Sequence, residues 1–212
     1  MGVKIKICGI RDKESIVAAH KADFIGFVFY QKSPRFINAI EAKELSNYAI
    51  HSQKRVGLFV NAEVNLIEYI TEFVGLDYIQ LHGDEKLEEI KEIKKRIDIP
   101  IIKSVLVSNV DDIKKSKGVG CFCDMILFDT KNSKNMLPGG SGISFDWNVL
   151  ENYNSSKNWI LAGGLNIDNI KKAIEITKAP IVDVSSGVEK KLGIKCKEKI
   201  KEIIGLVKND WE

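Results

Sequence analysis

Hydrophobic and polar positions follow two alternating patterns along this chain. Short, nearly continuous apolar runs, typical of strands that are covered on both faces, occur at residues 3–8, 24–29, 55–60, 78–81, 99–104, 125–129, 159–162 and 181–184. Longer segments with apolar residues at helical spacing follow them at residues 13–21, 39–50, 66–73, 85–96, 110–117, 145–152, 167–177 and 197–207. The pattern therefore predicts eight strands, each followed by a helix.

This repeat predicts an α/β protein built as a closed (β/α)8 barrel, the TIM barrel. With 212 residues, each of the eight units is about 26 residues long, which is compact for a fold that needs ~200 residues or more. A doubly wound open sheet has the same periodicity. The similar strand lengths, and the absence of a Gly-x-Gly-x-x-Gly sequence after the first strand, favour the barrel. Because no linker-like segment interrupts the repeat, we expect one domain over residues 1–212.

Composition and charge exclude several classes of protein. The hydrophobic fraction of 44% excludes a disordered chain, and 32 Lys and Arg against 29 Asp and Glu make a charge of +3, too even for a nucleic-acid surface. No apolar run is long enough to span a bilayer, and no secretory leader is visible. Cys8, Cys121, Cys123 and Cys196 form no C-x-x-C pair, which argues against a disulfide framework and a zinc site. We expect a cytoplasmic protein without nucleic-acid or membrane partners, with Cys121 and Cys123 buried.

Glycine and serine gather after the last two predicted strands. In (β/α)8 barrels the chemistry lies at the carboxyl ends of the strands, and phosphate is often bound there by backbone N–H groups after strands seven and eight. Glycine allows close backbone approach and serine adds donors, although each pair alone also fits a tight turn. A third stretch before the sixth helix is expected to fold over the same ligand, a sugar phosphate. The predicted phosphate-binding residues are Gly140, Ser141, Gly142, Gly163, Gly164, Ser185, Ser186 and Gly187.

Two reactive side chains end other predicted strands. Cys8 closes the first strand and Asp129 the sixth, so that they can face a ligand from two directions, as acid/base isomerisation requires. A thiol acts as a base only where its surroundings favour the thiolate. Taken alone, Cys8 also fits a small buried residue, and Asp129 a solvated carboxylate or a helix cap.

The order of short motifs along essentially the whole chain resembles the phosphoribosylanthranilate isomerase family. The motifs are KICG at 6–9, GFVF at 26–29, SPR at 33–35, VGLFVN at 56–61, QLHG at 80–83, Asp129, GGSG at 139–142, FDW at 145–147, LAGGL at 161–165 and DVSSGVE at 183–189. Each motif is weak by itself, and their order makes the resemblance specific.

The resemblance implies an Amadori rearrangement in tryptophan biosynthesis, from N-(5-phosphoribosyl)anthranilate to 1-(2-carboxyphenylamino)-1-deoxyribulose 5-phosphate. By the same resemblance, Asp129 is the general acid that opens the ribose ring, and Cys8 is the general base that removes the C2 proton of the resulting Schiff base. Arg35 is expected to bind the anthranilate carboxylate, and His82 and Asp183 to orient or bind the ligand. The cationic nitrogen of the substrate is the electron sink, so no metal or organic cofactor is expected. The only partner implied is the small-molecule substrate, and a monomer and a homodimer stay equally open.

Two other functions fit parts of the sequence, and one segment departs from the family pattern. An indole-glycerol-phosphate synthase would use Lys103, expected at the end of the fifth strand, but the glutamates that it needs at other strand ends are missing. A non-catalytic phosphate-binding barrel would have no chemical reason to keep both Cys8 and Asp129. Before the last helix, Cys196 stands where the family usually has an acid, which is expected to weaken the helix N-cap.

Overall fold

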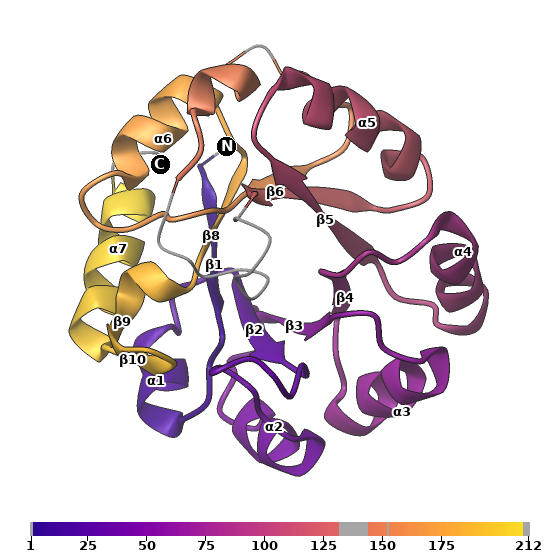
Figure 1. Cartoon of the computed structure of the whole chain (residues 1–212). Coiled ribbons are helices and arrows are strands. Elements are labelled where there is room, and N and C mark those ends of the chain that lie inside the picture. The colour runs from indigo at the N-terminus through magenta and orange to yellow at the C-terminus, as the bar shows by residue number, and fades with distance from the viewer. Residues whose placement is uncertain (1, 132–143, 152, 210–212) are drawn as a thin grey trace.

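The strands close into a barrel. The structure is a computed structural model that describes residues 2–131, 144–151 and 153–209. In this part of the chain, eight parallel strands pair in chain order and β8 pairs back onto β1, which excludes the open sheet (Figure 1). The strands are β1 (Lys4–Cys8), β2 (Phe24–Val28), β3 (Lys54–Phe59), β4 (Tyr78–Leu81), β5 (Ile101–Val107), β6 (Met125–Thr130), β7 (Trp159–Leu161) and β8 (Ile181–Val184).

Helices surround the barrel on the outside (Figure 1). They are α1 (Lys13–Ala18), α2 (Ala39–Ser46), α3 (Val64–Val74), α4 (Leu87–Arg96), α5 (Val110–Gly120), α6 (Ile170–Thr177) and α7 (Lys197–Asn209). Capping residues determine where two of these helices begin: Asp12 is the N-cap of α1, and Asn38 forms a capping box with Glu41 at the start of α2. None of the helices in the described part of the chain has the length and apolar character that a membrane crossing requires.

The helix predicted over residues 145–152 is wrong. A short 3-10 helix, η1 (Trp147–Leu150), stands there instead, and Asp146 caps it by accepting from the backbone N–H of Asn148. Trp147 and Leu150 are three residues apart and both are buried, so a single turn already places the two apolar side chains of this segment against the core.

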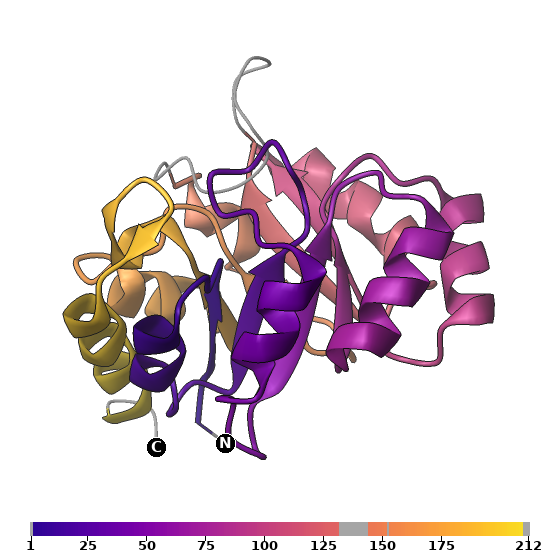
Figure 2. The same ribbon diagram turned by 90° about the horizontal axis from the view of Figure 1, so that it is seen from below.

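A hairpin that the apolar pattern did not predict lies at the carboxyl end of the barrel. Strand β9 (Glu189–Lys191) pairs antiparallel with β10 (Ile194–Lys195), and Gly193 turns the chain between them with a φ of +75°. Figure 2 shows this hairpin in yellow beside the mouth of the barrel, at the end opposite to the start of β1. The hairpin therefore brings charged side chains to the ends of the strands.

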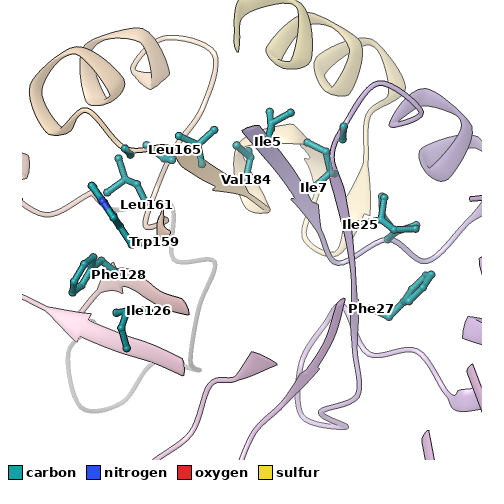
Figure 3. Packing of buried hydrophobic residues seen from close by; sticks show 14 of the residues in the cluster. Ile5, Ile7, Ile25, Phe27, Ile126, Phe128, Trp159, Leu161, Leu165 and Val184 are labelled. Carbon is teal, nitrogen blue, oxygen red and sulfur yellow. The ribbon is translucent and has the colours of Figure 1, made fainter. Parts of the chain in front are cut away.

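Two apolar clusters pack against the strands, one outside the barrel and one inside it, and polar residues fill the interior near the mouth. Residues such as Ile5, Ile7 and Phe128 pack between strands and helices (Figure 3). A second cluster, which includes Phe24, Ile102 and Ile160, fills the barrel interior away from the mouth. Side chains alternate along a strand, so Lys6 and Cys8, which alternate with Ile5 and Ile7 on β1, point into the barrel. The remaining interior, towards the mouth, is where the polar residues gather.

Candidate active site

A cavity opens at the carboxyl ends of the strands, and the predicted site residues meet there. Its lining comes from β1, β2, β3, β4, β6 and β8 and from loops at the carboxyl ends of the strands, including the loop after β7. All five side chains predicted to act on the ligand line it: Cys8, Arg35, His82, Asp129 and Asp183. These residues lie together because the barrel is closed: the carboxyl ends of all eight parallel strands surround one opening.

Cys8 lies in a crowded interior position. It ends β1, is 5% exposed, and faces Gly26 on the neighbouring strand. A Cβ atom at position 26 would lie 2.9 Å from the Cys8 sulfur, so the glycine leaves room for the thiol. Burial raises the pKa of the Cys8 thiol above its ordinary value, although the Lys6 and Lys195 ammonium groups oppose this shift.

A buried ion pair lies directly beside the thiol. Lys6 precedes Cys8 by two residues on β1, so both side chains point to the same face of the strand. The Lys6 side chain is fully enclosed, and its Nζ donates to Oδ2 of Asp183 on β8 at 2.9 Å. Burial lowers the pKa of Lys6, but the Asp183 carboxylate and Cys8 more than offset this, so the pKa is raised and the ammonium keeps its charge. Asp183 Oδ1 is buried without a partner among the described residues, so that it can accept from a ligand.

Asp129 is held by its own backbone and by His82. Oδ1 accepts from the N–H of Thr130 at 2.7 Å, and Oδ2 lies 3.2 Å from Nε2 of His82. The side-chain amide of Gln80 donates to Nδ1 of His82 at 2.9 Å. Because Nδ1 is thus an acceptor, a neutral His82 carries its hydrogen on Nε2 and donates it to Asp129. Gln80 therefore selects the histidine tautomer that orients Asp129.

Arg35 is fixed by a carboxylate of the hairpin. Its Nε and Nη2 donate to the two oxygens of Glu189 at 2.7 and 2.9 Å, in a bidentate pair. Burial raises the pKa of Glu189, but the positive charges and hydrogen bonds of Arg35 and Lys195 more than offset this. The pKa is therefore lowered and the carboxyl group stays ionised. Lys195 Nζ donates to Glu189 at 3.0 Å and to the carbonyl of Ser185 at 2.9 Å. The hairpin thus ties the Arg35 loop to the loop after β8.

The glycine pair after β7 has the backbone geometry of an anion site. Gly163 and Gly164 line the cavity with φ of +86° and +65°, a region that favours glycine. Their N–H groups have no acceptor among the described residues. Ser185 and Ser186 border the same cavity from the end of β8. These residues are therefore where the sequence predicted a phosphate, whereas the predicted Gly140, Ser141 and Gly142 lie outside the described residues.

Gly187 has a packing role that the sequence did not reveal. It lines a neighbouring depression with Lys199, and a Cβ atom at this position would lie 2.0 Å from the carbonyl oxygen of Leu165. The loops after β7 and β8 can approach this closely only because Gly187 has no side chain.

Replacing Gly187 by alanine is expected to lower the free energy of unfolding by about 1–3 kcal/mol, because the two backbones must move apart. Thermal or urea unfolding measures this effect. Gly118→Ala is the matched control: Gly118 is exposed on α5 with open space at its Cβ position, so alanine there should be neutral or mildly stabilising. Equal stability of the Gly187 variant and the wild type would contradict the packing role.

Two expectations about single residues are wrong. Lys103 lies in the middle of β5 rather than at its end, and its buried ammonium is held by Glu85 at 2.8 Å and by the carbonyl of Gly83 at 2.7 Å. Cys121 is exposed, because it lies in the turn after α5. Cys123, in contrast, is buried as expected, and burial raises the pKa of its thiol to about 11.

Other residues of the site were missed. The family motifs contain three of them, Lys6, Gln80 and Glu189, but the resemblance assigned no function to these residues. The fourth is Lys195, which lies in the segment that departs from the family pattern. A lysine inside an otherwise buried strand was the signal that could have identified Lys6. Among the described residues, no three His, Cys, Asp or Glu side chains are grouped so that they could hold a metal ion.

Comparison with known proteins identifies the family of this chain. Residues 5–205 match the family model described as N-(5'-phosphoribosyl)anthranilate (PRA) isomerase. The chain belongs to the phosphoribosylanthranilate isomerase family. It is therefore an isomerase, and the family indicated by the motif order is confirmed.

Individual relatives of this family align over nearly the whole chain. The N-(5'-phosphoribosyl)anthranilate isomerase of Paracoccus denitrificans is 41% identical over 207 residues, which cover 96% of each chain. The crystal structure of the phosphoribosylanthranilate isomerase from Thermotoga maritima superposes with a TM-score of 0.88 at 39% identity, over 98% of this chain and 99% of that one. A family structure in complex with reduced 1-(o-carboxyphenylamino)-1-deoxyribulose 5-phosphate has a TM-score of 0.84 at 37% identity, with the same coverage.

Proposed function

We propose that this isomerase converts N-(5'-phosphoribosyl)anthranilate into 1-(2-carboxyphenylamino)-1-deoxyribulose 5-phosphate in tryptophan biosynthesis, with Cys8 as general base and Asp129 as general acid. The observation that carries the proposal is that both side chains line one cavity together with Gly163, Gly164 and Ser186. A base, an acid and an anion site around one cavity are what the rearrangement of a phosphorylated aminopentose requires.

Ring opening is the first step. A protonated Asp129 gives its proton to the ribose ring oxygen, the bond between that oxygen and C1 breaks, and the nitrogen lone pair forms the C1–N double bond of a Schiff base. The Thr130 N–H and His82 hold the two carboxyl oxygens in place, which fixes the direction of proton donation.

Proton abstraction is the second step. The Schiff base nitrogen is cationic, so it acidifies the C2 hydrogen and accepts the electron pair when the C2–H bond breaks. The Cys8 thiolate takes this proton, and the enolamine formed then tautomerises to the ketone. The substrate itself supplies the electron sink, so these residues need no metal or organic cofactor for the reaction.

The two ends of the substrate match two parts of the cavity. The phosphate fits the N–H groups of Gly163 and Gly164, and the hydroxyl group of Ser186 adds a donor beside it, whereas the Ser185 hydroxyl donates to the carbonyl of Cys8 at 3.2 Å. The anthranilate carboxylate fits the side of Arg35, whose planar guanidinium is oriented by Glu189. The reaction would take place in the cytoplasm.

The test of the proposal follows the fluorescence of freshly generated phosphoribosylanthranilate after the protein is added. Rapid loss of the anthranilate-linked fluorescence, with the aminoketose as product, is expected. No change at high protein concentration would contradict the proposal. Binding of the reduced product analogue without turnover would then identify a phosphate-binding barrel that does not catalyse the reaction.

Replacing Arg35 by alanine is expected to raise KM about 10- to 100-fold with a smaller effect on kcat, because a charge-assisted bidentate contact to the substrate carboxylate is lost. Steady-state kinetics measure both constants. Arg11→Ala is the matched control. Arg11 is exposed and donates to the carbonyl of Pro34, which lies next to Arg35, so its removal should leave KM near the wild-type value. An unchanged KM with a collapsed kcat in the Arg35 variant would mean that the role of Arg35 is different.

A further inference from the structure

Lys6 is a buried charge of the barrel to which ring opening and proton abstraction assign no role. Lys6 is 0% exposed, in the interior of the barrel, and it contacts Asp183 on the neighbouring strand with an Nζ to Oδ2 distance of 2.9 Å. Removing an ammonium group from water is unfavourable before its ion pair is counted, and a buried pair is often no more stabilising than apolar residues of the same volume. Stability alone therefore does not account for a lysine at this position.

The position of Lys6 relative to Cys8 indicates what the charge does. Both side chains project from β1 to the same interior face, two residues apart, and Asp183 is the register partner of Lys6 on β8. Burial raises the pKa of Cys8, and the positive charge of the Lys6 ammonium is the largest effect that opposes this rise and favours the thiolate. Asp183 holds the ammonium in place and keeps it protonated.

The other charged groups around Cys8 do not replace Lys6. Strand β2 faces the thiol with Gly26 and has no titratable side chain. Lys195, from β10, acts on Cys8 by charge, but its ammonium is held by Glu189 and by the carbonyl of Ser185. Asp183, from β8, acts in the opposite direction and favours the neutral thiol. The remaining charged or titratable groups on the lining of the cavity are Tyr30, Arg35, His82 and Asp129.

We infer that Lys6 is a positioning residue, whose ammonium stabilises the anionic form of Cys8 in which the sulfur accepts the substrate proton. This inference rests on the proposed function for its consequence in catalysis, but not for the interaction between the two side chains. When the C2–H bond breaks and the S–H bond forms, the electron pair moves into the substrate and Lys6 keeps all its protons. The ammonium thus balances the sulfur charge before the transfer and takes no part in the transfer itself.

The test measures the ionisation of Cys8 directly, through the pH dependence of its alkylation by iodoacetamide. The rate is followed by mass spectrometry of the peptide that contains Cys8, in a background with Cys121→Ser and Cys196→Ser. Cys123 reacts slowly in this range, because it is buried and its pKa is about 11. Two neutral variants, Lys6→Met and Lys6→Gln, are compared with Lys6→Arg, which keeps the charge.

Both neutral variants are expected to raise the midpoint of Cys8 alkylation by at least about one pH unit, which lowers the rate about tenfold at a fixed pH below the midpoint. Lys6→Arg should stay closer to the wild type. In all active variants the acidic limb of the kcat/KM profile should move by the same amount as the alkylation midpoint. Lys103→Met is the matched control: it breaks another buried lysine–carboxylate pair, with Glu85, and should leave the Cys8 midpoint unchanged.

An unchanged midpoint in a folded Lys6→Met or Lys6→Gln protein would overturn the inference, and so would an equal shift in Lys103→Met. Circular dichroism and thermal unfolding establish which variants are folded, and one folded neutral variant is sufficient for the test. Failure of the proposed function would look different. The wild type would then leave the fluorescent substrate unchanged, while the alkylation midpoints would still respond to Lys6.

Discussion

Replacing Cys8 by serine is expected to lower kcat by roughly 10³- to 10⁴-fold, while the protein keeps its fold and its affinity for the reduced product analogue. The reason is chemical rather than steric. A hydroxyl group fits the space beside Gly26, but at neutral pH it is a far weaker base than a thiolate. Single-turnover measurements of fluorescence loss report the chemical step, and thermal unfolding reports the fold.

Cys123→Ser is the matched control for this variant. Cys123 is also buried, but it does not line the cavity, so its replacement should cost stability and leave turnover intact. Near-normal turnover in Cys8→Ser would show that another group removes the C2 proton. The proposed role of Lys6 would then lose its consequence for catalysis.

Replacing Asp129 by asparagine is expected to lower kcat by about 10²- to 10⁴-fold, because the amide has no proton to give to the ring oxygen. The amide oxygen can still accept from His82 or from the backbone of Thr130, so the geometry of the site should survive. Ring opening and proton abstraction can be separated with substrate that carries deuterium at C2. The isotope effect should decrease in Asp129→Asn, since ring opening then limits the rate.

Asp124→Asn is the control at the other end of the same strand. Asp124 accepts from the backbone N–H of Ile101 at 2.9 Å and pairs with Lys94, so its role is to hold β5 and β6 together. Its replacement should reduce the stability and leave kcat near the wild-type value. A wild-type rate in Asp129→Asn would instead contradict the assignment of the general acid.

The apolar pattern was sufficient to predict the barrel, and its limits have physical causes. The eight strands are covered on both faces, so most of their residues are apolar and each strand is visible in the sequence as a nearly continuous hydrophobic run. The segment at 145–152 has apolar residues at a helical spacing too, but Trp147 and Leu150 already reach the core within one turn. The hairpin at 189–195 has charged residues in both of its strands, so no apolar alternation marks it.

Only part of the candidate site could be predicted from the sequence. The predicted strand ends made Cys8 and Asp129 candidates, but their roles as base and acid followed only from the resemblance to the family. The partners of these side chains depend on strand closure: Lys6 and Asp183 are 177 residues apart, and the pairing of β1 with β8 makes them neighbours. Contacts of this kind follow from register and side-chain direction, which the sequence pattern does not specify.

A structure of this protein with the reduced product analogue bound would show whether Cys8 and Asp129 act on one ligand from two sides. We expect the phosphate to accept hydrogen bonds from the N–H groups of Gly163 and Gly164 at about 2.7–3.2 Å. We also expect the sulfur of Cys8 to face carbon 2 of the sugar, with the Asp129 carboxyl group on the opposite side of the ligand. A phosphate bound away from these glycines, or a ligand with both side chains on the same side or out of reach, would contradict this expectation.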